Sequence, residues 1–297
     1  MRGATRVSRS EPAQRSAAWR AASVARARPR VAVLLLVAVA LLAGCAGNER
    51  IDGRTDPTPP TTGPDATERS EAPRIELASV TAVTALGDSV PSGFACGCTP
   101  YPQLAGADLA RAAAHRVTTA NDAAPGYQTS NVLDQLRMYP SVDADVRRAQ
   151  VVLIEIGAND VEYTDACGTR VSCYAPMLPA VARNLDAIVQ RVRAIAGAHV
   201  TIVLLDYWNV WLGGKYERAR GASYVAAAET LTADVDDAIQ AEARARDAIY
   251  VDLRTAFRGP NRDWDETHLL APDGDHPDAA GQQRIAEAIS LAVLGRR

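Results

Sequence analysis

The sequence predicts a three-layer α/β fold with a five-stranded parallel sheet, formed by residues 75–297. Short runs of apolar and β-branched residues alternate along this stretch with longer segments in which apolar residues recur at helical spacing. Val151–Ile156 is apolar almost throughout, which is typical of a strand that is buried on both faces. Strands that alternate with helices favour a parallel sheet with helices packed on both sides.

The five predicted strands are short and rich in Val, Ile, Leu and Thr. They are residues 79–86, 115–120, 151–156, 199–205 and 248–253. Five helices alternate with them, at residues 101–114, 129–138, 176–196, 222–246 and 277–294. Apolar side chains at helical spacing identify the third helix, Thr129 or Ser130 caps the second, and Pro277 stands near the first turn of the last. We expect the strand order of flavodoxin-like folds.

Residues 1–44 are predicted to be a signal peptide rather than part of the fold. Three arginines precede Val31–Ala43, an apolar run of 13 residues that is too short to span a bilayer. The run leads into Leu42–Cys45, which resembles the bacterial lipobox and makes Cys45 the residue expected to carry a lipid. An ordinary secretory signal followed by an incidental cysteine is the alternative.

Residues 45–74 are predicted to be a disordered tether, because they are rich in Pro, Thr, Gly and charged residues and cannot form a core. Signal, lipid and tether together predict an exported protein that is held at the extracellular face of the cell membrane, or is secreted. Positions 45–297 hold 24 basic and 34 acidic residues, and this acidic balance argues against a nucleic-acid partner. Lys215 is the only lysine, and its surroundings lack the P-loop pattern.

Four polar clusters stand after predicted strands or before the last helix. They are Gly87-Asp88-Ser89, the segment 121–126, Gly157-Ala158-Asn159-Asp160 and Asp273-Gly274-Asp275-His276. Ligand and catalytic sites of parallel sheets lie beyond the carboxyl ends of the strands. We therefore expect these clusters to meet at one edge of the sheet.

The clusters contain the residue types of a nucleophilic hydrolase. A serine hydroxyl attacks efficiently only when a base removes its proton. His276 stands at the expected edge, and Asp273 three residues earlier can orient its ring, so that Ser89, His276 and Asp273 are the candidate catalytic residues. His268 has Asp265 at the same spacing but lacks the proline and helix that follow His276, and the histidines at 115 and 199 open strands at the opposite edge.

Acyl transfer also requires donors for the developing oxyanion. The backbone N–H groups of Ser89 and Gly126 and the side-chain amide of Asn159 are the candidates. Two alternatives stay open: Gly126 serves only as a turn, or Asp273 caps the last helix while His276 and Ser89 act as a dyad.

These motifs resemble blocks I, II, III and V of the SGNH (GDSL-type) hydrolases, over about residues 81–295. The resemblance implies an esterase or lipase that needs neither a metal nor a cofactor, with Ser89 as nucleophile, His276 as base and Asp273 as acid. It also implies that Ser89, Gly126 and Asn159 form the oxyanion hole. The residues at 90–93, Val-Pro-Ser-Gly, depart from the commoner Leu or Tyr after Gly-Asp-Ser, which leaves the leaving-group side of the pocket less defined.

The expected activity is hydrolysis of a carboxylic ester through an acyl-enzyme. The protein is expected to be monomeric. The substrate is a small-molecule, lipid or glycan ester. Carbohydrate O-deacetylation and phospholipid cleavage are the alternatives within enzymes. A catalytically silent lipoprotein that binds an envelope component is the alternative from another class.

Cys96, Cys98, Cys167 and Cys173 are expected to form disulfides, since the protein is predicted to be exported. Pairing 167 with 173 closes a short loop and leaves 96 with 98, while a crossed arrangement between the two loops is the alternative. A zinc site is disfavoured because no Cys-x-x-Cys is present.

Trp208 and Trp211 follow the fourth predicted strand at the expected catalytic edge. Such residues usually pack the interior of a loop. The alternative is that one of them forms a wall of the acyl pocket.

Overall fold

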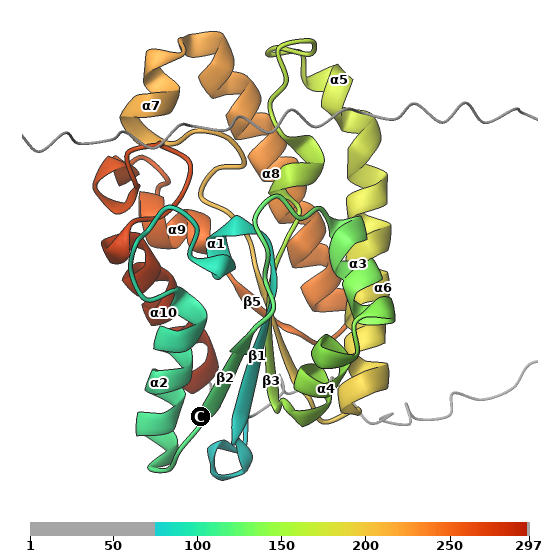
Figure 1. Cartoon of the computed structure of the whole chain (residues 1–297). Coiled ribbons are helices and arrows are strands. Elements are labelled where there is room, and N and C mark those ends of the chain that lie inside the picture. The colour runs from blue at the N-terminus through green and yellow to red at the C-terminus, as the bar shows by residue number, and fades with distance from the viewer. Residues whose placement is uncertain (1–74, 296–297) are drawn as a thin grey trace, which may run out of the picture. The chain divides into compact units, whose positions relative to one another are not determined.

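The computed structural model describes residues 75–295. The predicted signal peptide (1–44), the tether (45–74) and Cys45 lie outside the described residues. Within 75–295 the chain forms a five-stranded sheet whose strands all pair in parallel, in the order β2-β1-β3-β4-β5 (Figure 1). This arrangement confirms the predicted fold class and its flavodoxin-like strand order.

Each predicted strand overlaps an observed one. The strands are β1 (Ala82–Gly87), β2 (Thr118–Asn121), β3 (Val151–Glu155), β4 (Thr201–Leu205) and β5 (Ile249–Val251). All residues of the central strand β3 are buried, as its apolar run predicts. The second strand begins three residues later than predicted, because Ala114 ends the preceding helix in the left-handed conformation (φ +57°) and the chain needs the next residues to return to the sheet.

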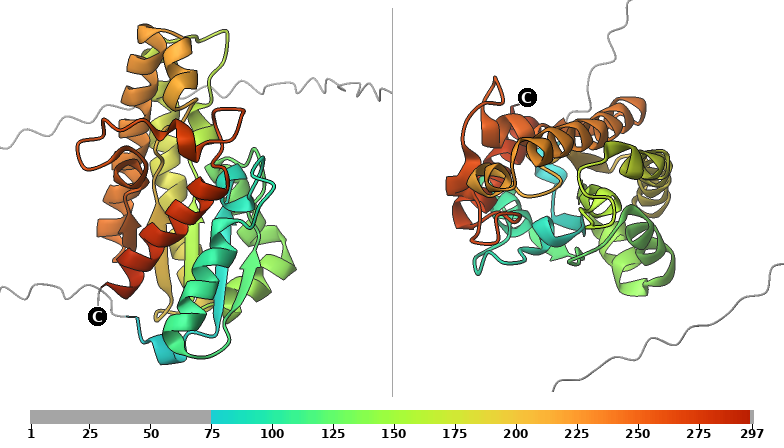
Figure 2. Two further views of the ribbon diagram at one scale, coloured as in Figure 1. Left: turned by 90° about the vertical axis from the view of Figure 1, so that its left-hand side faces the viewer. Right: turned by 90° about the horizontal axis from the view of Figure 1, so that it is seen from above.

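Helices cover both faces of the sheet (Figures 1 and 2). One layer contains α2 (Tyr101–Ala113), α9 (Leu253–Arg258) and α10 (Ala279–Leu294). The other layer contains α3 (Thr129–Met138), α4 (Pro140–Arg148), α6 (Leu178–Ala196) and α8 (Ala222–Ala245). The apolar stripes of these helices and the buried strands form one continuous core.

Several helices were not predicted from the sequence. Helix α4 begins with Pro140 in its first turn and buries only Val142 and Val146, so that its apolar pattern is too sparse to identify it. The other unpredicted elements have three to six residues: α9, whose bounds are given above, α1 (Ser89–Ser92), α5 (Val171–Tyr174), α7 (Gly214–Ala219), η1 (Leu77–Ser79), η2 (Ala158–Val161), η3 (Ala175–Met177) and η4 (Glu266–Leu269), where η denotes a 3₁₀ helix. Among residues 75–295, no helix has the length and apolarity needed to cross a bilayer.

The carboxyl ends of the strands lie at the upper end of the sheet in Figure 1, where the short helices gather. The loop after β1 leads into α1, and the loop after β3 leads into η2. Gly87 at the end of β1 pairs with Glu155 at the end of β3, so that these two loops begin side by side. The fold therefore brings the predicted polar clusters of these strands to one edge.

Candidate active site

Ser89 lies on a tight turn between β1 and α1. β1 ends at Gly87, whose φ is +150°, and a Cβ there would lie 2.1 Å from the backbone oxygen of Glu155. The position therefore requires glycine, since any side chain would collide with β3. Asp88 caps the short helix by accepting a hydrogen bond from the Val90 N–H at 3.0 Å, and Ser89 becomes its first residue.

Asp88 braces this turn from the interior of the protein. Its side chain is buried, and its Oδ2 accepts a hydrogen bond of 2.6 Å from the hydroxyl of Tyr207. Burial raises the pKa of Asp88 from 3.8 to about 6, although the hydrogen bonds from Tyr207 and Val90 oppose the rise. Burial likewise raises the pKa of the neighbouring Glu155 well above its usual range.

The raised pKa of Asp88 predicts a pH dependence of stability. An unfolded chain releases this proton near pH 4, whereas the folded protein keeps it up to about pH 6. The folded state binds more protons in this window, so the free energy of unfolding falls as the pH rises through it. In Asp88→Asn we expect the free energy of unfolding to fall less over this range of pH. Urea titrations between pH 4 and pH 7 measure the change.

In the variant Tyr207→Phe, the fall in the free energy of unfolding should extend to higher pH. The substitution removes the hydrogen bond that stabilises the Asp88 carboxylate, so that the proton is held to a higher pH and the fall extends above pH 6. Equal slopes in the wild type and both variants would show that Asp88 does not titrate in this window.

Asn159 and Asp160 lie in η2, directly after β3. The Asn159 Nδ2 donates to the backbone oxygen of Tyr127 at 2.9 Å. Asp160 accepts hydrogen bonds from the N–H and the hydroxyl of Thr129 at 2.9 and 2.7 Å. These contacts join η2 to the start of α3 and fix the orientation of the Asn159 amide.

Gly126 precedes Tyr127 in the loop after β2 and has a φ of +78°, which favours glycine. It does not line the cavity that contains Ser89, although Tyr127 next to it contacts Asn159. Its role as an oxyanion donor stays a prediction.

His276 and Asp273 are hydrogen-bonded to each other. The Asp273 Oδ2 lies 2.9 Å from the imidazole Nδ1, and its Oδ1 accepts the backbone N–H groups of Asp275 and His276 at 3.1 Å each. Burial raises the pKa of Asp273, but the hydrogen bonds from His276 and Asp275 outweigh it, and the pKa lies below the usual value. The Asp275 Oδ2 lies 3.9 Å from the other ring nitrogen, Nε2. The ring of Phe94 packs edge-on against the imidazole, with 4.9 Å between the ring centroids.

A cavity of about 210 Å³ joins Ser89, Asn159 and His276. Three sequence clusters that follow β1, follow β3 and precede α10 therefore meet at one site. The other histidines do not line this cavity. His268 is exposed and its Nδ1 contacts the backbone oxygen of Asp265, rather than a carboxylate.

Trp208 and Trp211 both line the cavity and are also packed in the core. Trp208 stacks on Phe257 with 4.2 Å between ring centroids. The Trp211 Nε1 donates to the backbone oxygen of Val161 at 2.8 Å. The two interpretations of these residues are thus compatible, because both residues are packed in the core and both line the cavity.

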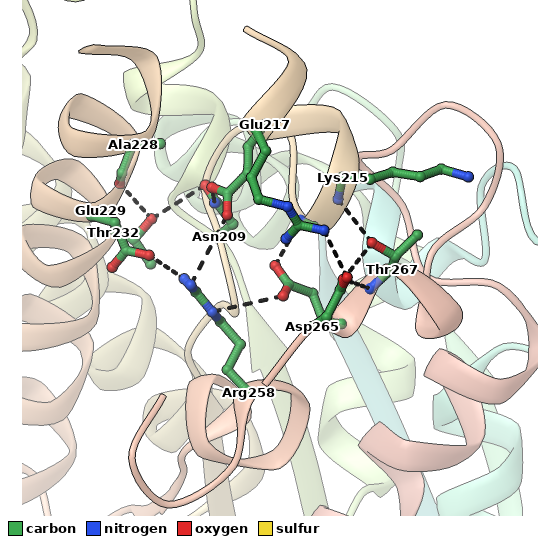
Figure 3. Close-up of polar contacts among 12 residues, drawn as sticks. Asn209, Lys215, Glu217, Ala228, Glu229, Thr232, Arg258, Asp265 and Thr267 are labelled. Carbon is green, nitrogen blue, oxygen red and sulfur yellow. Dashed lines mark hydrogen bonds and ion pairs between the residues drawn. The ribbon is translucent and has the colours of Figure 1, made fainter. Parts of the chain in front are cut away.

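A cluster of charged side chains joins α7, α8, α9 and η4 (Figure 3). Arg258 on α9 forms an ion pair with Glu229 on α8, and its guanidinium lies 4.0 Å from Glu217 on α7 and 3.7 Å from Glu266 on η4. Glu217 and Glu266 are buried, and burial raises the pKa of Glu217 to about 7 although Arg258 opposes the rise. Arg258 is therefore the charge that compensates two buried carboxylates.

This cluster also supports the cavity wall. The Glu217 Oε2 accepts a hydrogen bond of 2.8 Å from the Nδ2 of Asn209, which lines the cavity (Figure 3). The Gly213 N–H, at the start of α7, donates to the backbone oxygen of Gly274 at 2.8 Å. The charged cluster thus holds Asn209 in the segment after β4, and the backbone hydrogen bond of Gly213 ties the same segment to the loop that carries His276.

The structure pairs Cys96 with Cys98 and Cys167 with Cys173. The crossed arrangement is not the one observed. The first disulfide lies in the loop that follows α1 and carries Phe94, and the second links the loop that follows η2 to α5. Both therefore constrain loops that border the candidate site.

Sequence reasoning missed several side chains that surround the site. They are Phe94, Glu162, Tyr163, Arg220, Tyr224 and Asp275. Asp275 and Phe94 could have been suspected, because each lies within five residues of a candidate catalytic residue. The others come from α8 and from loops without a recognisable motif, and only the tertiary fold brings them to the cavity.

Comparisons with known proteins agree with this geometry. Residues 85–284, well over half of the chain, match the GDSL-like Lipase/Acylhydrolase family. No curated protein matches the sequence.

Solved structures share the fold at low sequence identity. A lipase from a goat rumen metagenome has 21% identity and a TM-score of 0.55, covering 71% of this chain and 97% of its own. A variant of an acetyl-xylooligosaccharide esterase from Geobacillus stearothermophilus has 18% identity and a TM-score of 0.54, covering 74% and 96%. A lipase/acylhydrolase from Enterococcus faecalis has 18% identity and a TM-score of 0.50, covering 73% and 96%. With the family match over residues 85–284, the chain belongs to the GDSL-like lipase/acylhydrolase family, whose members hydrolyse carboxylic esters.

Proposed function

We propose that the protein is an exported, lipid-anchored serine hydrolase that cleaves short-chain carboxylic esters through an acyl-enzyme. The observation that carries the proposal is the cavity shared by Ser89, His276 and Asn159, together with the 2.9 Å hydrogen bond between Asp273 and the His276 Nδ1. A nucleophile, a base and an orienting acid in this relation can carry out acyl transfer.

In the proposed reaction the Ser89 Oγ attacks the ester carbonyl and its proton passes to the His276 Nε2. The bond to the alcohol then breaks, and His276 returns the proton to the leaving oxygen. Water attacks the acyl-Ser89 ester and gives its proton to His276, and the acid departs as Ser89 recovers its proton. Asp273 holds the ring in the tautomer that presents Nε2 and stabilises the imidazolium that forms twice in the cycle.

The oxyanion is proposed to be stabilised by the backbone N–H of Ser89, the side-chain amide of Asn159 and the backbone N–H of Gly126. One N–H of the Asn159 amide is used by the Tyr127 carbonyl. An amide nitrogen carries two N–H groups, so the second is available to the substrate.

Export and anchoring are proposed from the sequence. The apolar run Val31–Ala43 and the lipobox that ends at Cys45 support a lipid anchor, and residues 45–74 are long enough to hold the catalytic domain away from a membrane.

The size of the cavity supports a short acyl chain. Its volume of about 210 Å³ is below the roughly 300–1,000 Å³ of pockets that enclose drug-sized ligands. An acetyl or butyryl group suits such a space better than a long lipid chain. This favours esterase or O-deacetylase activity over phospholipid cleavage.

A panel of esters tests the proposal. We expect the highest kcat/KM for acetyl to butyryl aryl esters or for acetylated sugars, with a steep fall for acyl chains of eight or more carbons. Hydrolysis of none of these esters, and of no phospholipid, would instead support a silent binding protein.

A further inference from the structure

We propose that Arg220 forms a binding subsite for an anionic group, a carboxylate or a phosphate, on the ester that the enzyme cleaves. The proposal rests on the proposed function, because it concerns the substrate of the Ser89 site. Arg220 lines the same cavity as Ser89 and His276. Within residues 75–295 it is the only arginine or lysine that does so.

Arg220 is held by aromatic rings. Its Cζ lies 4.9 Å from the ring centroid of Tyr163 and 4.8 Å from that of Tyr224. The ring of Trp211 packs against both tyrosines, at 5.1 Å in each case. The Leu212 N–H donates to the Tyr224 hydroxyl at 3.2 Å and fixes that ring further. Side chains from three separate segments thus form a platform that orients the guanidinium before a ligand arrives.

The charge of Arg220 has no compensating partner in the described part of the chain. Its guanidinium has no carboxylate within 4.0 Å and donates no hydrogen bond there, whereas Arg218 on α7 pairs with Asp265 at 2.6 Å. The cation–π contacts with the two tyrosines involve the charge of the guanidinium, and no other described residue accepts a hydrogen bond from its N–H groups, which are the donors that a carboxylate or phosphate needs. The platform therefore orients Arg220 and leaves its donors for a ligand.

Three carboxylates line the cavity. That of Asp88 is buried and accepts hydrogen bonds from Tyr207 and Val90, while the other two shape the expected selectivity. Asp275 lies beside the His276 Nε2 at 3.9 Å, and Glu162 is exposed. Both repel anions, so an anionic ester binds more tightly than a neutral one only where its charge reaches the Arg220 guanidinium. This competition predicts that Glu162→Gln and Arg220→Gln change the use of anionic esters in opposite directions.

Matched pairs of esters test the subsite. The first pair places the charge on the acyl side: the 4-nitrophenyl monoester of glutaric acid against the 4-nitrophenyl ester of monomethyl glutarate. The second pair places it on the alcohol side: an acetylated glycerol phosphate against the corresponding acetylglycerol. We expect wild-type kcat/KM to favour the anionic member of at least one pair, and the pair that responds identifies the side of the ester that carries the charge.

Variants assign any preference to Arg220. Arg220→Gln should lower kcat/KM for the preferred anionic ester by about 10-fold or more, through KM, and leave its neutral partner unchanged. Arg220→Lys should retain part of the preference, because it keeps the charge but loses the planar fork. Arg218→Gln is the control, since it removes a nearby arginine that does not line the cavity. The wild-type preference should also weaken with added salt.

The outcomes separate this proposal from the proposed function. Equal kcat/KM for both members of both pairs, or equal losses on neutral and anionic esters in Arg220→Gln, would overturn the subsite while leaving Ser89 catalysis intact. Loss of hydrolysis of neutral esters in Ser89→Ala tests the proposed function independently.

Discussion

Replacing Ser89 with alanine should reduce kcat for a short-chain ester by at least about 10⁴-fold, because the reaction loses its nucleophile. His276→Ala should cause a loss of similar size, since the hydroxyl then has no base. The double variant should be little worse than either single variant, because residues that act as one unit contribute non-additively. The measurement is kcat on 4-nitrophenyl acetate with the three variants in parallel.

Two comparisons show whether such losses report chemistry. Ser89 is partly exposed at a helix start and forms no side-chain hydrogen bond within the described residues, so Ser89→Ala should leave the thermal unfolding midpoint nearly unchanged. Asn159→Ala should lower kcat by a smaller factor, roughly 10²–10³, because it removes one of several oxyanion donors. Additive losses in Ser89→Ala/His276→Ala would indicate that the two residues act in separate steps.

Replacing Arg258 with leucine should lower the free energy of unfolding by about 3–5 kcal/mol. The side chain compensates the buried carboxylates of Glu217 and Glu266, which have no other cation within 4.0 Å in residues 75–295. Denaturant titrations at pH 7 measure the change. The exposed pair of Arg147 and Asp143, 2.6 Å apart on α4, provides the control, and Arg147→Leu should cost less than about 1 kcal/mol.

Arg258→Leu should also affect catalysis. Glu217 holds Asn209 in the cavity wall, and the neighbouring Gly213 binds the loop that carries His276. We expect a lower kcat/KM even at temperatures where the variant is folded. A loss of stability equal to that of Arg147→Leu would show that the cluster behaves as an ordinary surface ion pair.

Most of the fold, but only part of the candidate site, could be predicted from the sequence. Strands buried on both faces could be predicted because nearly all of their side chains are apolar, as at residues 151–154 of β3. Helix α4 was not predicted, because only Val142 and Val146 of its residues are buried. Local pattern therefore predicts an element only when its contribution to the core is large.

Some residues of the candidate site could likewise be predicted from local sequence patterns, and others could not. Ser89, Asn159 and His276 stand in recognisable motifs at strand or helix ends, and parallel topology brings such ends to one edge. Arg220, Tyr163 and the Asp88–Tyr207 contact carry no local signal, since they depend on the packing of segments that are distant in the sequence. The cysteine spacing also left more than one disulfide pairing open, and only the folded backbone distinguishes them.

Covalent labelling shows whether Ser89 is the nucleophile and whether His276 activates it. The protein is incubated with a fluorophosphonate, which reacts with activated serines, and the modified peptide is mapped by mass spectrometry. We expect a single adduct on Ser89 that is absent in Ser89→Ala and forms far more slowly in His276→Ala. An adduct on another residue, or a labelling rate that does not depend on His276, would contradict these roles of the two residues.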